Sequence, residues 1–439
     1  MMPALRRDPL GVFLDAARRF GDIAHLRVGP LHGLLLNDPD HIRQVLQDNA
    51  RNYHKSPLYD KVKVAVGEGL LTSEGSHWLR QRRMAQPAFH RQRISGLTAV
   101  MAEAAQELAA RWQATAAQAA PIDVADEMMA VTQRIVLRTL LGGGIGVLGG
   151  ELGRAWSLVN QHIGESFWSL GLTDRWPTPK NLRFRRALAV LDAAVQQIID
   201  ARRRTDGESD DLLSMMMSAR DEDTGQAMTD RQLRDEVMTL LLAGHETTSL
   251  ALAWTWYLLS QHAHARRRME EELDQVLDGR VPSFGDLGSL PYTRMVIEEA
   301  MRLYPPAWGI SRVAVASDGI GGYQLPAGWL VFVVPFVMHR HPRYWENPDR
   351  FDPERFTADR SAVRPKFVYL PFGAGPRQCI GNQFATIEAH LVLATLAQRY
   401  RLETIAGHRV VPWPLVTLRP RHGIRMRVHS RRSSASSAA

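Results

Sequence analysis

Apolar and polar positions divide the chain into a mainly helical body with short β segments near both ends. Residues 22–37 carry apolar runs on either side of Gly29-Pro30, which predicts a β-hairpin. Apolar residues recur at three- and four-residue spacing over 97–118 and 124–141, a pattern typical of amphipathic helices. Residues 312–336 and a segment after 407 predict short strands. The pattern favours a mainly α protein with a small β region.

The longest helical signal covers residues 229–261. Thr229 and Gln232 are spaced as a capping box at its start. From Leu233 to Leu259 the segment is apolar on nearly every face, which indicates a buried helix. At roughly 1.5 Å per residue it would be about 50 Å long. A helix of this length would cross the whole molecule, so we predict one continuous domain over residues 1–428. Residues 429–439 contain no large apolar residue, and we predict that this tail is unstructured.

Composition and charge exclude several classes of protein. The 439 residues are 45% hydrophobic and 23% charged, as in ordinary globular proteins. The net charge of +8 comes with no zinc-finger spacing or basic arm, so we expect no nucleic-acid partner. The N-terminus has no apolar run long enough for a signal peptide or a membrane span, and we therefore expect a cytoplasmic protein. A single cysteine excludes an internal disulfide and any multi-cysteine metal site.

That cysteine lies in the glycine-rich segment 372–381, FGAGPRQCIG. Gly373, Gly375 and Gly381 allow a backbone to approach a flat group closely. Cys379 directly precedes the last expected helix, at 380–400, whose N-terminal dipole favours a thiolate. A thiolate can ligate haem iron, and Arg377 could pair with a haem propionate. The alternative is a small buried cysteine after a glycine-rich turn.

A second unusual segment, AGHETT at 243–248, interrupts the long apolar helix. Thr247 can donate a hydrogen bond to the carbonyl of Ala243 and distort the helix locally, which would leave a groove for dioxygen. Glu246 beside Thr247 supplies an acid and an alcohol for proton transfer. The alternative is that Glu246 pairs with a buried cation and Thr247 only packs. We interpret His245 as structural or pocket-lining and not as an iron ligand.

These segments resemble the cytochrome P-450 family in order and spacing, from about residue 20 to residue 425. The family's haem-binding signature is matched at Phe372, Gly375, Arg377, Cys379 and Gly381, and its oxygen-groove motif at Ala243, Gly244, Glu246 and Thr247. Its ExxR motif and later arginine are matched at Glu299, Arg302 and Arg355, to which the resemblance gives a structural role. Residues of four segments, two of them not yet named, would surround the haem: Trp78, Arg82, Arg312 and Arg377 at the propionates, and Phe372, Gly373 and Ala243 at the ring.

The resemblance implies a fold, a cofactor and a reaction. The fold would be a mainly α, triangular helical prism with a long central helix and small β-sheets. Haem b would bind with Cys379 as the iron ligand. The enzyme would insert one oxygen atom of O2 into an apolar small molecule, with Glu246 and Thr247 delivering protons. The amino-acid sequences of two segments resemble most the fatty-acid-hydroxylating branches and their soluble bacterial relatives. The substrate could be a fatty acid, a terpenoid or another natural product.

Electrons would come from NAD(P)H through a ferredoxin or flavodoxin and its reductase, because no reductase domain follows the last strands. A basic patch on the haem-loop side would attract this acidic partner; we expect it at Arg80, Arg83, Arg364 and Lys366. By resemblance, the pocket walls would come from 55–72, 160–185, 307–310 and 414–417, narrowed by Trp168, Trp308 and Trp413.

Two other functions stay open. A haem-thiolate peroxygenase or isomerase would keep the cysteine segment but would not need Glu246 and Thr247. A non-catalytic haem sensor would need no proton relay at all. Turnover with a surrogate ferredoxin and O2, compared with peroxide alone, separates the three.

Overall fold

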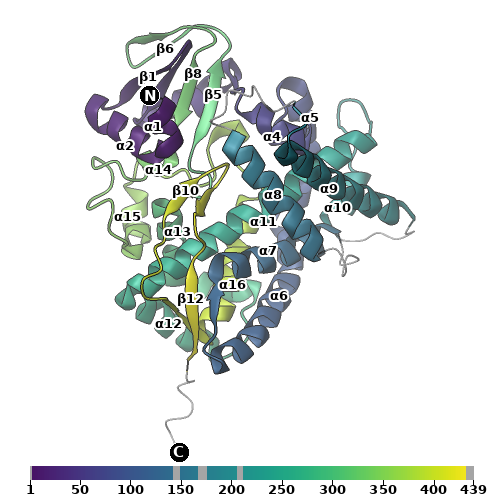
Figure 1. The fold of residues 1–439 in the computed structure, drawn as a ribbon, viewed down its shortest axis with the longest axis vertical. Coiled ribbons are helices and arrows are strands. Elements are labelled where there is room, and N and C mark those ends of the chain that lie inside the picture. The colour runs from purple at the N-terminus through teal and green to yellow at the C-terminus, as the bar shows by residue number, and fades with distance from the viewer. Residues whose placement is uncertain (1, 142–148, 167–175, 205–210, 432–439) are drawn as a thin grey trace, which may run out of the picture.

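The computed structural model describes residues 2–141, 149–166, 176–204 and 211–431, and helices make up most of it (Figure 1). The α-helices are α1 Met2–Arg7, α2 Pro9–Phe20, α3 Pro39–Arg43, α4 Tyr59–Val66, α5 Gly75–Ala85, α6 Arg91–Ala117, α7 Val124–Leu141, α8 Gly149–Ser166, α9 Pro179–Arg204, α10 Leu212–Ser218, α11 Asp230–Gln261, α12 Ala263–Leu277, α13 Pro291–Leu303, α14 Pro335–Met338, α15 Ala358–Ala362 and α16 Asn382–Ala397. The strands are β1 Ile23–Val28, β2 Leu31–Leu36, β3 Tyr53–Lys55, β4 Pro121–Asp123, β5 Ile310–Ala314, β6 Asp318–Ile320, β7 Tyr323–Leu325, β8 Leu330–Val333, β9 Tyr400–Thr404, β10 Pro412–Pro414, β11 Leu418–Pro420 and β12 Arg425–Ser430.

Helix α11 runs through the middle of the molecule (Figure 1). The predicted capping box is present: the Thr229 N–H donates to Gln232 Oε1 at 2.8 Å, and the Gln232 N–H donates to Thr229 Oγ1 at 3.3 Å. Helices α7, α13 and α16 pack against it, and most of its side chains are buried. A helix that is covered on all sides needs apolar residues all round, as the sequence indicates.

The β region joins segments that are far apart in the sequence. One sheet has the order β1-β2-β8-β5-β3, in which β1 and β2 form the predicted hairpin and β2 pairs in parallel with β8. Gly29 turns the hairpin with a φ of 61°, a backbone conformation that favours glycine. This sheet places Lys55 of β3 opposite Arg312 of β5.

The C-terminal boundary at residue 428 is wrong. Strand β12 continues to Ser430 and pairs with β9, with His429 opposite Arg401. The Arg431 N–H then donates to the carbonyl of Arg399 at 2.8 Å, and its guanidinium pairs with Asp274 at 2.7 Å. Backbone pairing at a sheet edge does not depend on side-chain hydrophobicity, so composition does not reveal it. The rest of the expected tail, residues 432–439, lies outside the described residues.

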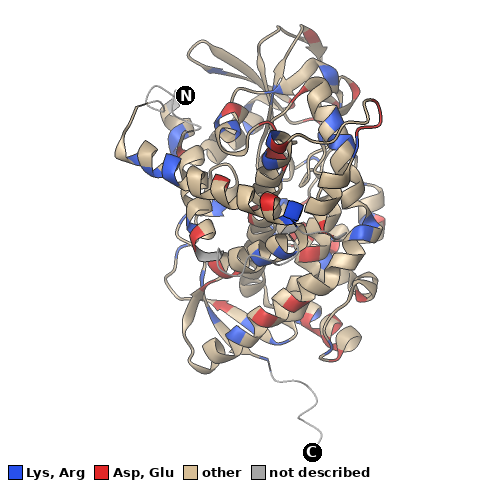
Figure 2. Cartoon of the chain, turned by 90° about the vertical axis from the view of Figure 1, so that its right-hand side faces the viewer, with Lys and Arg blue, Asp and Glu red and all other residues tan. Residues whose placement is uncertain are grey.

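The buried apolar residues form one large cluster, which extends from Leu34 to Val428, and a smaller one beneath α2. Phe13 of α2 packs against Trp308 and Phe332 in the smaller cluster. In the part of the chain that the structure describes, no helix combines the length and apolar character that crossing a bilayer requires. Basic and acidic positions alternate over the side seen in Figure 2.

Candidate active site

An interior space opens beside the middle of α11. Ala243 is exposed and Thr247 is partly exposed, although His245, Glu246 and Thr248 on the same turns are buried. An exposed side chain halfway along a buried helix requires a hollow next to it. Thr247 Oγ1 donates to the carbonyl of Ala243 at 2.8 Å, as the sequence predicts.

Cys379 is also exposed, although protein surrounds it: burial raises the pKa of its thiol, while the Gly381 backbone and the Arg82 charge lower it. Its N–H donates to the carbonyl of Phe372 at 2.9 Å, which closes the glycine-rich loop. Gly375 has a φ of 68°, and a Cβ atom there would lie 1.9 Å from the carbonyl oxygen of Leu46. Only glycine fits at this point of the loop.

His339 fixes the segment that leads into the cysteine loop. Its Nε2 accepts a hydrogen bond from the Leu370 N–H at 2.8 Å, so Nδ1 carries the proton and faces the Arg302 carbonyl at 3.3 Å. Burial, together with the Arg302 charge, lowers the pKa of His339 to about 3. The neutral imidazole therefore joins the ExxR helix to the loop. Its partners are remote in sequence, and the sequence analysis missed it.

The ExxR residues form a fully buried ion pair. Arg302 Nε lies 2.6 Å from Glu299 Oε2, and the side chains of both residues have no exposed surface. The Arg302 guanidinium also donates to the carbonyls of His339, Pro348 and Arg350. Arg355 lies 3.4 Å from Glu299. The structure thus brings together Glu299, Arg302 and Arg355, which the resemblance places behind the haem.

Three cations gather where the Cys379 loop meets β3 and β5. The Arg377 guanidinium lies 3.7 Å from the centre of the Trp78 ring, donates to the Ser73 carbonyl at 2.9 Å and pairs with Glu74. Lys55 Nζ donates to the same carbonyl, also at 2.9 Å. Arg312 is buried next to them and donates to the Ser311 carbonyl.

The charges at this cluster favour an anionic ligand. Burial and the charges of Arg377 and Arg312 lower the pKa of Lys55 to about 7, and burial lowers the pKa of Arg377 to about 10, although Glu74 opposes this. With Arg82 nearby, the cations Lys55, Arg82, Arg312 and Arg377 outnumber the acids Glu74 and Glu236 that act on Lys55. A dianionic group such as haem, with its two propionates, would neutralise the surplus, so these residues fit that cofactor.

Arg82 contacts the cysteine loop. Its guanidinium donates to the Gln378 carbonyl at 3.1 Å, directly before Cys379, and burial lowers its pKa. Lys55, in contrast, was missed, since a lysine in a short strand carries no signal of burial.

Glu246 is held by several donors. Its Oε1 accepts from Arg419 Nε at 2.8 Å and from Thr417 Oγ1 at 2.5 Å, and its Oε2 accepts from Asn160. Glu246 therefore pairs with a cation, as the alternative interpretation predicts, and that cation is Arg419. The carboxylate joins α11 to α8 and to the β10–β11 turn, and Thr247 lies next to it on the side of Ala243.

Comparison with known proteins decides the family. The family model described as Cytochrome P450 matches residues 2–422. The chain belongs to the cytochrome P450 family. It is 38% identical over 418 residues to cyclooctatin synthase of Streptomyces melanosporofaciens, covering 94% of this chain and 90% of that protein. It is 34% identical to pentalenene oxygenase of Streptomyces avermitilis, covering 97% of this chain and 94% of that one.

A solved structure gives the same result. The cytochrome P450DA heme domain superposes with a TM-score of 0.89 at 29% identity, covering 97% of this chain and 94% of that chain. The expected P450 fold is confirmed, and with it the enzyme class of haem-dependent monooxygenase and the cofactor haem b.

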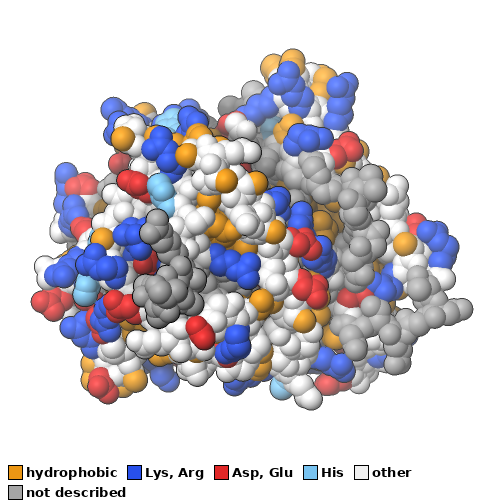
Figure 3. Space-filling view, turned by 90° about the horizontal axis from the view of Figure 1, so that it is seen from below, with side chains coloured by type: hydrophobic (Ala, Val, Ile, Leu, Met, Phe, Trp, Pro, Cys, Tyr) orange, Lys and Arg blue, Asp and Glu red, His pale blue; other side chains and the backbone are white. Residues whose placement is uncertain are grey.

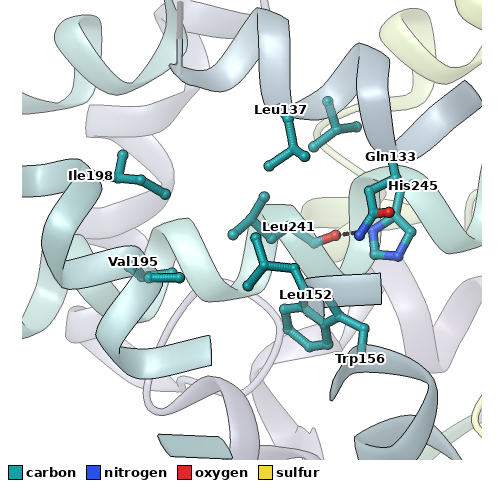
Figure 4. Close-up of a pocket in the computed structure, with 10 residues that line it drawn as sticks. Gln133, Leu137, Leu152, Trp156, Val195, Ile198, Leu241 and His245 are labelled. Atoms are coloured by element: carbon teal, nitrogen blue, oxygen red, sulfur yellow. Dashed lines mark hydrogen bonds between the residues drawn. The ribbon is translucent and has the colours of Figure 1, made fainter. Parts of the chain in front are cut away.

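His245 of this P450 faces away from Ala243, toward a small apolar void between α7, α8, α9 and α11 (Figure 4). Its Nδ1 pairs with the Leu241 carbonyl, and its ring meets that of Trp156 edge-on at 6.2 Å. Burial lowers its pKa, so it is neutral. This contact pattern supports a structural role.

The basic patch expected on the P450 is wrong for Arg80 and Arg83, because acids pair with both. Arg83 pairs with Asp223 at 2.6 Å, and Arg80 lies 3.7 Å from Asp221. Arg364 stacks over Trp345 at 4.4 Å, while Lys366 is exposed. These arginines are neutralised or stacked by residues distant in sequence, which charge counting does not see. The face of the molecule seen from below in Figure 3 carries basic, acidic and apolar side chains.

Proposed function

We propose that this P450 hydroxylates a terpenoid by inserting one oxygen atom of O2 into a C–H bond. The observation that carries the proposal is the interior space at Ala243 and Thr247 in a chain that is 38% identical to cyclooctatin synthase and to cyclooctat-9-en-7-ol 5-monooxygenase. Pentalenene oxygenase, another relative, is named for a hydrocarbon. Oxygenation of alicyclic carbon skeletons is common to these names.

The haem would be held by residues that the structure already positions. Cys379 would be the iron ligand, and the bound haem would supply oxygen activation, favoured by the electron density of a thiolate. Arg377, Arg312 and Trp78 would surround the propionates, with Lys55 as an additional cation and Arg82 beside the cysteine loop. Ala243, Phe372 and Gly373 would border the ring.

Protons would reach the site along α11. Thr247 would hold ordered water in the space beside Ala243, and its hydroxyl passes protons inward. Glu246, held by Arg419, Thr417 and Asn160, would position this turn beside Thr247 and take part in delivering protons.

Electrons would come from NAD(P)H through a ferredoxin or flavodoxin and its reductase, in the cytoplasm. A cavity of about 240 Å³ lies beside the cysteine loop, lined by Arg294, Glu298 and Gln378 among others. It offers both signs of charge, so we expect docking by shape as well as by charge.

The direct test is product analysis. The holoenzyme, supplied with spinach-type ferredoxin, its reductase and NADPH, is incubated with cyclooctat-9-en-7-ol, pentalenene and a fatty acid in separate reactions. We expect a terpenoid product that carries one hydroxyl group more than the terpenoid supplied. Exclusive oxidation of the fatty acid would replace the proposed substrate class, and turnover with peroxide but not with the electron-transfer partners would replace the reaction type.

Thr247→Ala should uncouple the reaction. Without the hydroxyl, water and protons in the space beside Ala243 are poorly ordered, and reduced oxygen leaves as peroxide. General acid–base groups contribute about 10²–10⁴-fold, and we expect product per NAD(P)H to fall at least about tenfold while NAD(P)H oxidation continues. Peroxide and product are measured in one reaction.

The control for this variant is Thr255→Val on the same helix, because the Thr255 hydroxyl is buried and bonds only to the Ala251 carbonyl at 2.7 Å. Unchanged coupling in Thr247→Ala would remove Thr247 from proton delivery.

A further inference from the structure

Glu74 stands directly before α5 but does not cap it. A side-chain acceptor at this position usually binds the first N–H groups of the helix that follows. The Glu74 side chain forms no such bond. Its Oε1 accepts the Lys55 N–H of β3 at 2.8 Å, and its Oε2 pairs with the Arg377 guanidinium of the cysteine loop. The carboxylate therefore joins two segments that are remote from each other in sequence.

The Glu74 carboxylate and the carbonyl before it face the same two cations. Arg377 and Lys55 Nζ each donate to the Ser73 carbonyl at 2.9 Å, and Lys55 Nζ lies 3.9 Å from Glu74 Oε1. The side chains of Arg377 and Lys55 are only 16% and 8% exposed. Since little water screens them, charges at these distances act strongly on one another. Residues 73 and 74 thus hold two like charges close together.

Glu74 reduces the cost of this arrangement. Burial and the charges of Arg377 and Arg312 lower the pKa of Lys55, and burial lowers the pKa of Arg377. The negative charge of Glu74 opposes the fall in both. The carboxylate therefore favours the charged forms of the lysine and the arginine, while it offsets part of their combined positive charge.

Helix α5 contacts the cysteine loop at two points. At its start Glu74 pairs with Arg377, and about two turns later Arg82 donates to the Gln378 carbonyl at 3.1 Å. Trp78 lies between these contacts, with its ring centre 3.7 Å from the Arg377 guanidinium. The Glu74 pair therefore fixes where the indole and the arginine meet the cysteine loop.

We propose that Glu74 is a positioning residue for haem: it holds Arg377 and Lys55 in place for the propionates and sets the net charge that these two cations present to the cofactor. This inference rests on the proposed haem site and is independent of the substrate. A negative charge near haem disfavours the ferrous state, which carries one electron more than the ferric state. Glu74 would therefore hold the reduction potential below the value that the two cations alone would give.

The test separates the charge of Glu74 from its position. Glu74→Gln keeps the length of the side chain and removes its charge, whereas Glu74→Asp keeps the charge and shortens the side chain by one methylene. The reduction potential of the substrate-free holoenzyme is measured by spectroelectrochemical titration, and haem retention is measured by the rate of haem transfer to apomyoglobin. Neither measurement requires turnover.

We expect Glu74→Gln to favour the ferrous state about three- to tenfold, which for a one-electron couple raises the reduction potential by up to about 59 mV. Glu74→Asp should leave the potential near that of the wild type. It should accelerate haem transfer about three- to tenfold, because the shorter side chain cannot hold Lys55 and Arg377 together.

Glu68→Gln is the matched control for the charge. Glu68 precedes α5 in the same loop, its side chain is 49% exposed, and it pairs with Lys63 at 2.6 Å. Because solvent screens an exposed charge, its removal should change neither the reduction potential nor the rate of haem transfer.

A wild-type potential in Glu74→Gln would overturn the charge role, and wild-type haem transfer in Glu74→Asp would overturn the positioning role. Lower thermal stability without either change would make Glu74 only an ion pair of the fold. Arg377→Met tests the haem site itself and should accelerate haem transfer whatever the role of Glu74. If Arg377→Met retained haem as the wild type does, the proposed haem site would be wrong, and not the role of Glu74 alone.

Discussion

Cys379→His should abolish monooxygenase turnover without preventing folding. A neutral imidazole cannot supply the electron density of a thiolate, so O–O cleavage loses its driving force. We expect product formation at the level of the reaction without enzyme, and loss of the red-shifted Soret band that thiolate ligation gives to the reduced carbon-monoxide complex. The loop should persist, because Gly375 and the Cys379 N–H bond to the Phe372 carbonyl, not the thiol, define its shape.

The comparison for this variant is Gln378→His, one residue earlier in the same loop, where the side chain is exposed. It introduces the same imidazole but keeps the thiol and should retain the red-shifted band. If Cys379→His also retained that band, another group would have to be the iron ligand.

The sequence predicts this fold well where the evidence is local. The long helix and its capping box at Thr229 follow from periodicity and from residues only a few positions apart. The hairpin at 22–37 follows from one glycine-proline break. Such signals need no knowledge of what packs against each element.

What the sequence does not reveal depends on remote partners. Lys55, Glu236 and His339 have ordinary sequence surroundings and become notable only when β3, α11 and the cysteine loop meet. Arg80 and Arg83 fail as a docking patch for the same reason, since Asp221 and Asp223 come back to meet them. A charged residue is interpretable from sequence only when its partner lies on the same helix.

Glu246 shows how the two kinds of evidence combine. The motif identifies an acid beside Thr247, and the structure adds Arg419, Thr417 and Asn160 as its partners. An ion pair with these additional hydrogen bonds holds the carboxylate in one position. We therefore assign the moving proton chiefly to Thr247 and its water, with Glu246 holding α8, α11 and the β10–β11 turn in register.

Arg302→Met should destabilise the protein more than any surface substitution. It removes a cation with no exposed surface and leaves the Glu299 carboxylate with Arg355 and the Asp352 N–H as partners, together with unpaired carbonyls at His339, Pro348 and Arg350. Breaking a buried ion pair from one side costs about 3–5 kcal/mol. We expect the free energy of unfolding, measured by urea denaturation, to fall by that amount and haem retention to fall with it.

Arg294→Met on the same helix is the matched control. Arg294 forms an i,i+4 pair with Glu298 at 3.4 Å, but its side chain is 56% exposed, so its loss should change the free energy of unfolding by less than about 1 kcal/mol. The double variant Glu299→Met/Arg302→Met distinguishes the cost of losing the ion pair from the cost of burying the Glu299 carboxylate without Arg302. It removes that carboxylate as well, so it should be more stable than Arg302→Met alone. If Arg302→Met were no more destabilising than Arg294→Met, the ion pair would not anchor α13 to the 348–352 segment. The order of the cysteine loop would then have to depend on His339 and its hydrogen bond from the Leu370 N–H.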